Sequence, residues 1–306
     1  MILTITLNPS IDISVHVTKL IPEEKLRCEQ YEKEVGGGGI NVAKGLNRLG
    51  LDSCALFFSA GQNGRWIEQR LADDHQRILP VNVAGETREN ITIDDISSHL
   101  EYRLVNKGKK ISSLDLEKFW LKLNSINTAP EFVIVSGSFP PGINTRFSKA
   151  VAQWCARKGS RLVVDLPADQ LLPWFSSNPF LIKPNLAEFY QLAGRKKMTT
   201  AQVIKQARQW ISQHYAQHIA ISMSASGGIL ATDQEVVELK APSVKVQSTV
   251  GAGDSMVAGM IYQFSKKASL RDTLRMGLAC GSAATIQKGT KLFDPTNARR
   301  LYRLIK

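Results

Sequence analysis

The amino-acid sequence predicts an α/β fold with a mostly parallel sheet. Over most of the 306 residues, short β-rich apolar segments alternate with segments of helical period, and this alternation is typical of repeated strand–helix–strand units. Hydrophobic residues make up 43% and charged residues 22% of the chain, near the globular average, which excludes disordered and collagen-like classes. A chain of this length can bury a large core without disulfides.

The elements follow from the pattern in chain order. Apolar segments predict strands at residues 3–7, 53–58, 78–83, 132–136, 161–165, 180–182 and 218–222. The segments between them predict helices at residues 40–49, 64–73, 114–126, 145–158, 186–193 and 199–215. The last third predicts a hairpin-like region at 228–239, followed by helices near 253–264, 270–287 and 295–304.

Two stretches interrupt this alternation. Residues 13–35 and 89–105 show strand-like alternation with many polar residues and no intervening helix. We interpret them as strands outside the main sheet that form a flap, and a pair of edge hairpins is the alternative that the pattern leaves open. The sequence has no internal repeat, low-complexity tract or linker, so we predict one domain over residues 1–306 with these strands inserted.

Charge and cysteine usage exclude several classes of function. The formal net charge is +12, but it is spread along the chain without any nucleic-acid-binding motif. We therefore expect no nucleic-acid partner; a solvated basic surface or small phosphorylated ligands can account for the charge. The cysteines stand apart and form no CxxC pair, which fits a reducing cytoplasm. They are Cys28, Cys54, Cys155 and Cys280.

No membrane partner is expected either, because no apolar run approaches the roughly 18 residues that span a bilayer. The short apolar run at residues 1–7 has no basic residue before it and is ended by Asn8 and Pro9. We interpret this run as the first strand rather than a signal peptide.

The strongest functional motif is STVGAGDS at residues 248–255, which is followed by a helical pattern. Its glycines let a turn present backbone N–H groups, and the positive end of the helix points the same way, so the motif predicts an anion hole. Asp254 lies in the first helical turn, where its carboxylate could accept a proton from an attacking hydroxyl during phosphoryl transfer. The alternative is an ordinary aspartate favoured by the helix dipole.

A second motif is GGGGINVA at residues 36–43, where a glycine run lets a ligand approach the backbone and Asn41 opens a helix. It is neither a Walker A motif nor a complete GxGxxG, because Val42 occupies the third glycine position. A nucleotide-dependent oxidoreductase is therefore disfavoured. A flexible turn is the alternative.

Weaker signals complete the set. Asp12 follows the first strand, and the loop SGSFPPG at residues 136–142 follows a buried strand. Both features are consistent with a ligand-binding side of the sheet. The alternatives are an ordinary exposed aspartate for Asp12 and a plain turn for the loop. Asn185 and Glu188 are three residues apart at a helix start. This spacing suits hydrated Mg²⁺ and suits a capping box equally well.

Taken together, these motifs carry a family resemblance. GGGGINVA, SGSFPPG, KPNLAE and STVGAGDSMVAG occur in the order and spacing of the ribokinase-like sugar kinases, and the resemblance covers essentially the whole chain. The sequence is most similar to the phosphofructokinase B branch, and residues 25–28, 246–249 and 281–285 most resemble its 6-phosphofructokinases. The resemblance implies a three-layer α/β/α domain with a small β-lid. It also implies ATP-dependent phosphorylation of a hexose phosphate, with fructose 6-phosphate expected and tagatose-6-phosphate kinase or 1-phosphofructokinase as alternatives.

The resemblance also implies roles for individual residues around the sugar. Asp254 would be the catalytic base, and the amides of Gly251, Ala252 and Gly253 would form the anion hole. The sugar hydroxyls would be held by Asp12, Gly37, Gly38 and Asn41. Arg88 and Ser138 would bind the phosphate of the sugar, and Lys25 and Arg27 would lie on the lid near that phosphate and the neighbouring subunit of a homodimer.

For ATP, the resemblance implies Lys183, Asn185, Ser222, Ser224 and Gly227, and Glu188 would hold Mg²⁺ through water. Relatives of this kind often bind K⁺ beside the anion hole, and the matching positions here are Ser248, Val250, Ala284, Gly289 and Lys291.

Three positions depart from the family pattern: Ser224 replaces a glycine, residues 166–168 are Leu-Pro-Ala instead of a polar turn, and Gln287 replaces an asparagine. These departures are the support for a second hypothesis, a catalytically silent sugar-phosphate sensor.

Overall fold

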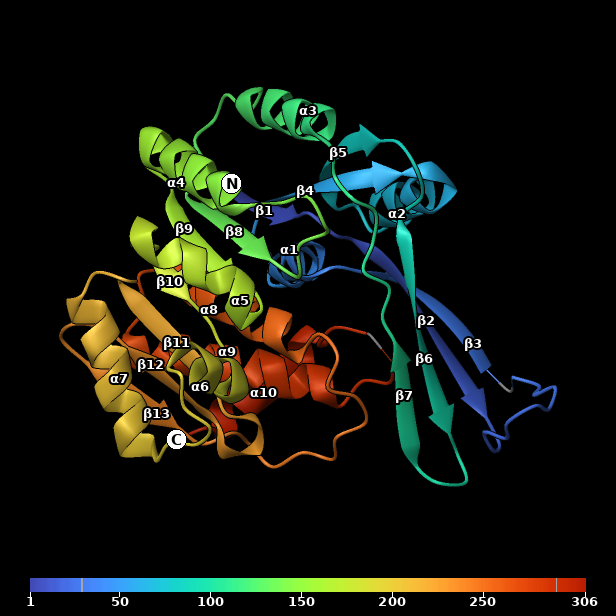
Figure 1. Ribbon diagram of the computed structural model, residues 1–306. Helices are drawn as coiled ribbons and strands as arrows, with labels where there is room; N and C mark the ends of the chain where they lie inside the picture. The colour runs from blue at the N-terminus through green and yellow to red at the C-terminus, as the bar shows by residue number, and fades with distance from the viewer. Residues whose placement is uncertain (29, 290) are drawn as a thin grey trace.

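The computed structural model describes residues 1–28, 30–289 and 291–306. In this part of the chain, nine strands form the main sheet in the order β13-β12-β11-β10-β9-β8-β1-β4-β5 (Figure 1). Their bounds are β1 (Ile2–Thr6), β4 (Ser53–Ala60), β5 (Arg77–Val83), β8 (Phe132–Ser136), β9 (Arg161–Asp165), β10 (Leu181–Ile182), β11 (His218–Ser222), β12 (Gly228–Ala231) and β13 (Val236–Leu239). The predicted α/β fold is thus confirmed.

The sheet is parallel from β5 to β11, and β12 and β13 extend it as an antiparallel edge. From β1 the chain first builds β4 and β5 on one side and later returns to build β8, β9, β10 and β11 on the other. The order therefore reverses between β1 and β8. Ligands of open α/β sheets bind beyond the carboxyl ends of the strands at such a reversal.

Helices cover both faces of the sheet (Figure 1). One face carries α3 (Ser113–Asn124), α4 (Thr145–Lys158), α5 (Ala168–Leu171), α6 (Leu186–Leu192) and α7 (Thr200–Ser212). The other carries α1 (Gly38–Arg48), α2 (Gly61–Asp73), α8 (Ala252–Ser265), α9 (Leu270–Thr285) and α10 (Pro295–Leu304). Successive residues of β8 serve both cores: Val133 and Val135 pack on the first face, and Phe132 and Ile134 on the second.

The predicted elements differ from the observed ones mainly at their ends. The helix expected at 199–215 ends at Ser212, and His214 follows it with a left-handed φ of 58°. The short helix α5 and the 3₁₀ turns η1 (Leu172–Ser177) and η2 (Ser224–Ser226) were not predicted. Such segments are too short to show a helical period.

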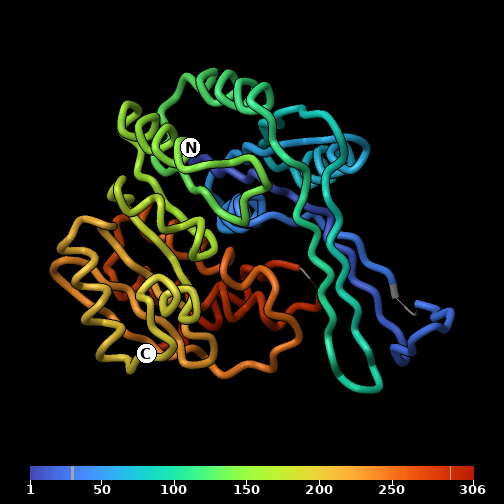
Figure 2. Tube along the Cα trace, viewed as in Figure 1, coloured from blue at the N-terminus to red at the C-terminus, as the bar shows by residue number. Residues whose placement is uncertain are grey.

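The two polar stretches form a second sheet, in the order β3-β2-β6-β7, which we call the lid. Its strands are β2 (Ser10–Val17), β3 (Gln30–Gly36), β6 (Arg88–Asp95) and β7 (Leu100–Leu104). Figure 2 shows these strands leaving the body together and extending beyond it on one side. The flap interpretation is therefore confirmed over two separate edge hairpins, because β2 pairs directly with β6 in parallel register.

The register gives the lid two different faces. Ile13, Ile91 and Leu104 are partners across one face, and Val15, Ile93 and Tyr102 form the next row on it. On the opposite face the rows are polar: Asp12 pairs with Asn90, and Ser14 with Thr92 and Arg103. The alternation noted in the sequence thus separates an apolar face from a polar one.

All four cysteines are free. Cys28 is exposed in the connection between β2 and β3, whereas Cys54, Cys155 and Cys280 are buried. Burial raises the pKa of Cys54 to about 11 and that of Cys155 to about 12, and it raises the pKa of Cys280 as well. No helix in the described part of the chain is long and apolar enough to cross a membrane.

Candidate active site

Asp254 lies in the first turn of α8, directly after the turn at Gly251, whose φ of 73° suits glycine. Asn41 Nδ2 donates a hydrogen bond of 2.9 Å to Asp254 Oδ2, and Ser136 Oγ lies 3.4 Å from Oδ1. Burial and the nearby charge of Asp165 raise the pKa of Asp254 to about 7, against the opposing effects of Asn41, Lys183 and Ser136. A carboxylate with this pKa is suited to accept a proton at neutral pH.

Three neighbouring strands deliver the polar groups around Asp254. Ser136 ends β8, Asp165 ends β9 and Lys183 directly follows β10. Lys183 Nζ forms an ion pair of 3.0 Å with Asp165 Oδ1, and Ser136 Oγ lies 3.5 Å from Asp165 Oδ2. Burial disfavours the charge of Lys183, but the nearby carboxylates of Asp165, Glu188 and Asp254 together outweigh burial and raise the pKa of Lys183. Lys183 therefore remains a fixed cation beside the base.

Lys183 was predicted from the sequence, whereas Asp165 and Ser136 were not predicted as site residues. The available signal was their position, since each ends a predicted buried strand on the side of the sheet where ligands bind.

The glycine run brings α1 close to this edge of the sheet. Gly37 has a φ of 122°, and a Cβ on Gly38 would come within 2.6 Å of the backbone nitrogen of Gly137. Only glycines allow the N-terminus of α1 to pack against the loop after β8. This packing places Asn41 on Asp254, so the run is a tightly packed turn rather than a flexible one.

Asp12 and Arg88 come from the polar face of the lid. Asp12 Oδ1 accepts hydrogen bonds from Ser10 Oγ at 2.8 Å and from Asn90 Nδ2 at 2.9 Å. Arg88 donates to the carbonyl oxygen of Asn8 at 3.0 Å and to that of Asn106 at 2.6 Å. Burial lowers the pKa of Arg88, and the charge of Asp12 opposes this shift. These bonds fix both side chains where the lid joins the body.

A cavity of about 530 Å³ lies beside Arg88. Ser138, from the loop after β8, lines the same cavity, and so does Lys107 from the segment after β7. The structure thus brings together the two residues that the resemblance assigned to the sugar phosphate.

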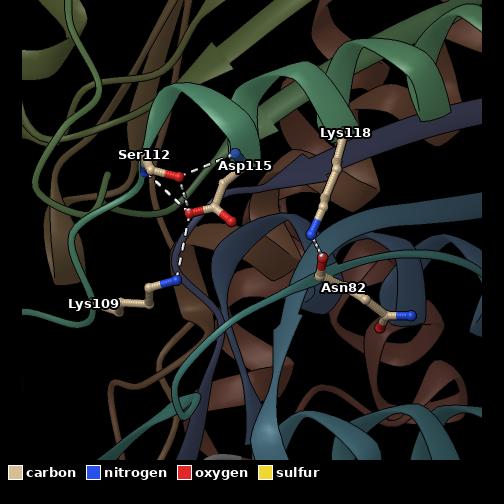
Figure 3. A network of polar contacts seen from close by, with 5 residues as sticks. All are labelled: Asn82, Lys109, Ser112, Asp115 and Lys118. Carbon is tan, nitrogen blue, oxygen red and sulfur yellow. Dashed lines mark hydrogen bonds and ion pairs between the residues drawn. The ribbon is translucent and has the colours of Figure 1, made fainter.

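The segment after β7 is held in place by α3 (Figure 3). Ser112 caps this helix, its backbone N–H donating to Asp115 Oδ2 at 3.0 Å, and Lys109 Nζ lies 3.4 Å from the same oxygen. Lys118 on the next turn donates to the carbonyl oxygen of Asn82 at 3.3 Å. These contacts anchor the chain that carries the Asn106 carbonyl to Arg88.

A second cavity, of about 450 Å³, lies beside the GAGD turn. Ser222, Ser224, Gly227 and Gly253 line it, with Met256, Leu278 and other small or apolar residues. Ser224 has a left-handed φ of 51°, the conformation for which glycine is the usual residue. Three of the five residues assigned to ATP, namely Ser222, Ser224 and Gly227, therefore share one cavity, whereas Lys183 and Asn185 do not line it.

Asn185 and Glu188 form the capping box of α6. The Asn185 side chain accepts from the backbone nitrogen of Glu188 at 2.9 Å, and the Glu188 carboxylate accepts from that of Asn185 at 2.7 Å. Burial raises the pKa of Glu188. Among the described residues, no group of three or more His, Cys, Asp or Glu side chains could hold a metal ion. The Mg²⁺ role of Glu188 stays a prediction.

The positions assigned to K⁺ lie partly together. Ser248, Val250 and Gly289 line a polar cavity of about 280 Å³ between the lid and the body. Ala284 is buried in the core, and Lys291 Nζ forms an ion pair of 3.4 Å with Glu32 of the lid. Lys25 and Arg27 lie exposed in the connection between β2 and β3, apart from the groups around Asp254.

One contact of the lid was not predicted. Arg103 of β7 extends from the polar face, and its Nη2 lies 3.4 Å from Thr249 Oγ1 in the GAGD turn. Arg103 also pairs with Glu101 on its own strand. The lid therefore reaches the predicted anion hole through an arginine.

Residues 5–297 match the pfkB family of carbohydrate kinases. The chain belongs to this family. The predicted ribokinase-like resemblance is confirmed, and so is the prediction of an enzyme that transfers a phosphoryl group to a carbohydrate.

This kinase is 32% identical over 302 residues to the ATP-dependent 6-phosphofructokinase isozyme 2 of Escherichia coli, with 98% of this chain and 97% of the relative covered. It is 31% identical over 295 residues to the 1-phosphofructokinase of Bacillus subtilis, with 96% of each chain covered.

Solved structures give the same result. The kinase matches a crystal structure of phosphofructokinase-2 from Escherichia coli in complex with potassium, with a TM-score of 0.93, 32% identity and coverage of 99% of this chain and 98% of that chain. It matches the tetrameric inhibited form of that enzyme with a TM-score of 0.90 and 30% identity, at the same coverage.

Proposed function

We propose that this kinase transfers the γ-phosphoryl group of ATP to a hydroxyl of a hexose phosphate, with fructose 6-phosphate as acceptor and fructose 1,6-bisphosphate as product. The observation that carries the proposal is that the neighbours of Asp254 connect it to two cavities. Gly253, its neighbour, lines the cavity with the nucleotide residues, and Ser136, its hydrogen-bond partner, begins the loop that lines the cavity with Arg88.

In this mechanism the acceptor hydroxyl lies beside Asp254. The hydroxyl oxygen attacks the γ-phosphorus, the bond to the β-phosphate oxygen breaks, ADP leaves, and the proton passes to the Asp254 carboxylate. The first N–H groups of α8 have no partner within the helix and stabilise the charge that develops on the transferred group. Lys183, held by Asp165, supplies a fixed positive charge next to the same position.

Mg²⁺ fits this site as an ion held mainly by the nucleotide. Glu188 uses one carboxylate oxygen in its capping box, which leaves the other for a water of the ion, and Asp165 offers a second carboxylate nearby. Mg²⁺ commonly keeps several waters and takes only one or two carboxylates together with substrate phosphates. When bound, it would neutralise charge on those phosphates. K⁺ would use the cavity lined by Ser248, Val250 and Gly289.

We also propose that the kinase is a homodimer built through the apolar face of the lid. Near the body this face packs against α1 and α2, but farther out Tyr31, Leu100, Tyr102 and Leu104 are 42% to 61% exposed. A second copy would cover these side chains with its own lid. Lys25 and Arg27, which lie in the connection between β2 and β3, could then approach the acceptor cavity of the partner.

A coupled ADP-release assay tests the proposed function. The acceptors are fructose 6-phosphate, fructose 1-phosphate, tagatose 6-phosphate and unphosphorylated fructose. We expect the highest kcat/KM with fructose 6-phosphate. A higher kcat/KM with fructose 1-phosphate or tagatose 6-phosphate would make that sugar the acceptor in place of fructose 6-phosphate. Equal activity on free fructose would refute the requirement for a phosphorylated sugar. No turnover with any sugar would favour the silent sensor.

A further inference from the structure

We propose that Gln170 binds the phosphate group that the acceptor sugar already carries. This inference rests on the proposed function, because it concerns the acceptor cavity of a hexose-phosphate kinase. Gln170 lies in the short helix α5, two residues after the Leu-Pro-Ala stretch at 166–168 that departs from a polar turn, and lines the cavity of about 530 Å³ with Arg88 and Ser138. This helix follows the end of β9, which supplies Asp165.

The orientation of the Gln170 amide is fixed by one contact. The backbone N–H of Phe139 donates to Gln170 Oε1 at 2.6 Å. An N–H can donate only to an acceptor, so the oxygen of the amide must face Phe139. The Nε2 group, with two hydrogens, then faces away from Phe139, and it has no hydrogen-bond partner among the described residues. Gln170 therefore has donors available on the wall of this cavity.

The other groups around the cavity favour an anion. Arg88 has five N–H groups, and the three bonds to Asn8 and Asn106 leave two of them available. Lys107 adds an ammonium, and Ser138 adds a hydroxyl without a partner in the described part of the chain. Asp169 is the opposing charge on the rim.

A phosphate group presents three strong acceptor oxygens. The donors of Arg88, Lys107, Ser138 and Gln170 come from four separate segments around one cavity, so together they can satisfy oxygens that point in different directions. Because the Gln170 amide is neutral, its donors add to phosphate binding without a further counter-charge. An unphosphorylated sugar would leave these donors unpaired, which disfavours its binding.

Gln170 has a second, structural role that the test must separate from ligand binding, since its oxygen also holds the loop at Phe139. The variant Gln170→Glu keeps an oxygen for the Phe139 N–H and replaces the two donors with a carboxylate oxygen that repels phosphate. Gln170→Ala removes both contacts. Gln209→Glu makes the same chemical change on the exposed surface of α7 and serves as the matched control.

We expect Gln170→Glu to raise KM for the phosphosugar by about tenfold or more, the size of a lost charge-assisted contact, with KM for ATP and kcat close to wild type. Gln209→Glu should leave all three unchanged. An unchanged phosphosugar KM in Gln170→Glu, together with a raised KM in Gln170→Ala, would overturn the proposal and leave only the structural role.

A binding measurement without ATP separates this proposal from the proposed function. Fructose 6-phosphate and inorganic phosphate are titrated against the wild type and each variant, and the shift in melting temperature is recorded. If Gln170→Glu fails to fold, Gln170→Ala decides. A smaller ligand-induced shift with an unchanged melting temperature of the free protein supports contact with phosphate. An unchanged shift, or a smaller shift together with a lowered melting temperature of the free protein, overturns it. Should the wild type turn over no hexose phosphate, the proposed function fails, and these shifts still decide the role of Gln170.

Discussion

Asp254 is surrounded by groups of opposite influence, and their balance sets the pH at which it can act. Burial is the largest effect and, with the charge of Asp165, disfavours the ionised carboxylate, whereas Lys183 favours it; the pKa of Asp254 is thereby raised to about 7. A base must be ionised to accept a proton, so its activity appears as the pH rises through this pKa.

We expect kcat/KM to rise with pH to a plateau, with a midpoint near the raised pKa of about 7. Asp165→Asn removes a like charge, which lowers the pKa of Asp254 and moves the midpoint to lower pH. The measurement is the pH profile of both proteins, with Asp233→Asn, on the exposed turn between β12 and β13, as control. The sugar phosphate also titrates near about pH 6, but equally in all three profiles. A midpoint that stays in place in Asp165→Asn would contradict the assigned coupling.

Asp254→Asn tests the base itself. The amide keeps the size of the side chain and a partner for Asn41 but cannot accept the proton. Loss of a positioned base usually lowers turnover by about 10²–10⁴-fold, and binding of ATP and phosphosugar, followed by calorimetry, should persist. A variant within about threefold of wild type, or roughly 0.7 kcal/mol, would exclude the role.

Ser224 holds a backbone conformation that its side chain disfavours, with a φ of 51°. Ser224→Gly removes strain of about 1 kcal/mol or more and adds about 0.5–1 kcal/mol of unfolded-chain entropy. We therefore expect stability equal to or slightly above wild type and no loss in affinity for ATP. Gly227→Ala is the contrasting variant, since its Cβ would come within 2.7 Å of Lys240 Cα. A clear loss of stability in Ser224→Gly would mean that the serine side chain contributes to the nucleotide turn.

At the scale of elements, the lid shows how far a pattern can be interpreted. Alternation along residues 13–35 and 89–105 predicts strands with one polar and one apolar face. The alternation does not predict which strands pair, because pairing depends on contacts between residues that are far apart in the sequence. Asp12 therefore stands out only weakly in the sequence, and Arg103 not at all, although both lie on the polar face, from which Arg103 contacts Thr249.

Arg103→Ala should lower kcat more than it raises either KM. The guanidinium joins β7 to the GAGD turn through Thr249, so its loss weakens lid closure over the reacting groups. We expect a decrease of about tenfold, the lower end for a hydrogen bond to a charged group, with partial recovery in Arg103→Lys. Arg77→Ala, which breaks an exposed ion pair with Asp52 at the start of β5, is the control. Equal kinetics for Arg103→Ala and Arg77→Ala would show that the contact does not affect turnover.

The same limit applies to the sheet. Periodicity locates its strands because each buried run is bounded by turns, and the GAGD and GGGG motifs locate two site segments because glycine has a specific backbone role. The pairing of Lys183 with Asp165, and of Ser136 with Asp254, could not be predicted, since it arises only when β8, β9 and β10 lie side by side. For Glu188, the spacing from Asn185 fits both a Mg²⁺ site and a capping box, and the structure shows the capping box.

At the scale of the whole molecule, the exposed apolar part of the lid is the surface from which the proposed assembly follows. A homodimer closed through this face predicts a mass in light scattering of twice the 33.8 kDa of one chain. Tyr102→Lys and Leu104→Asp place charges on the apolar face and should give folded monomers. Thr92→Lys alters the opposite face and should leave the assembly intact. A wild-type protein that is fully active as a monomer would refute the proposed homodimer. If the variants are active as monomers, neither active site takes residues from the partner subunit.

The distribution of the thiols has a practical consequence for studying the lid. Cys28 lies exposed in the connection between the lid strands β2 and β3, while the other three sulfurs are buried and poorly ionised at neutral pH. Since the thiolate is the reactive form, a maleimide dye added to the folded kinase should attach at one position without any engineered cysteine. Fluorescence from that dye would then report opening, closing and pairing of the lid in the natural chain.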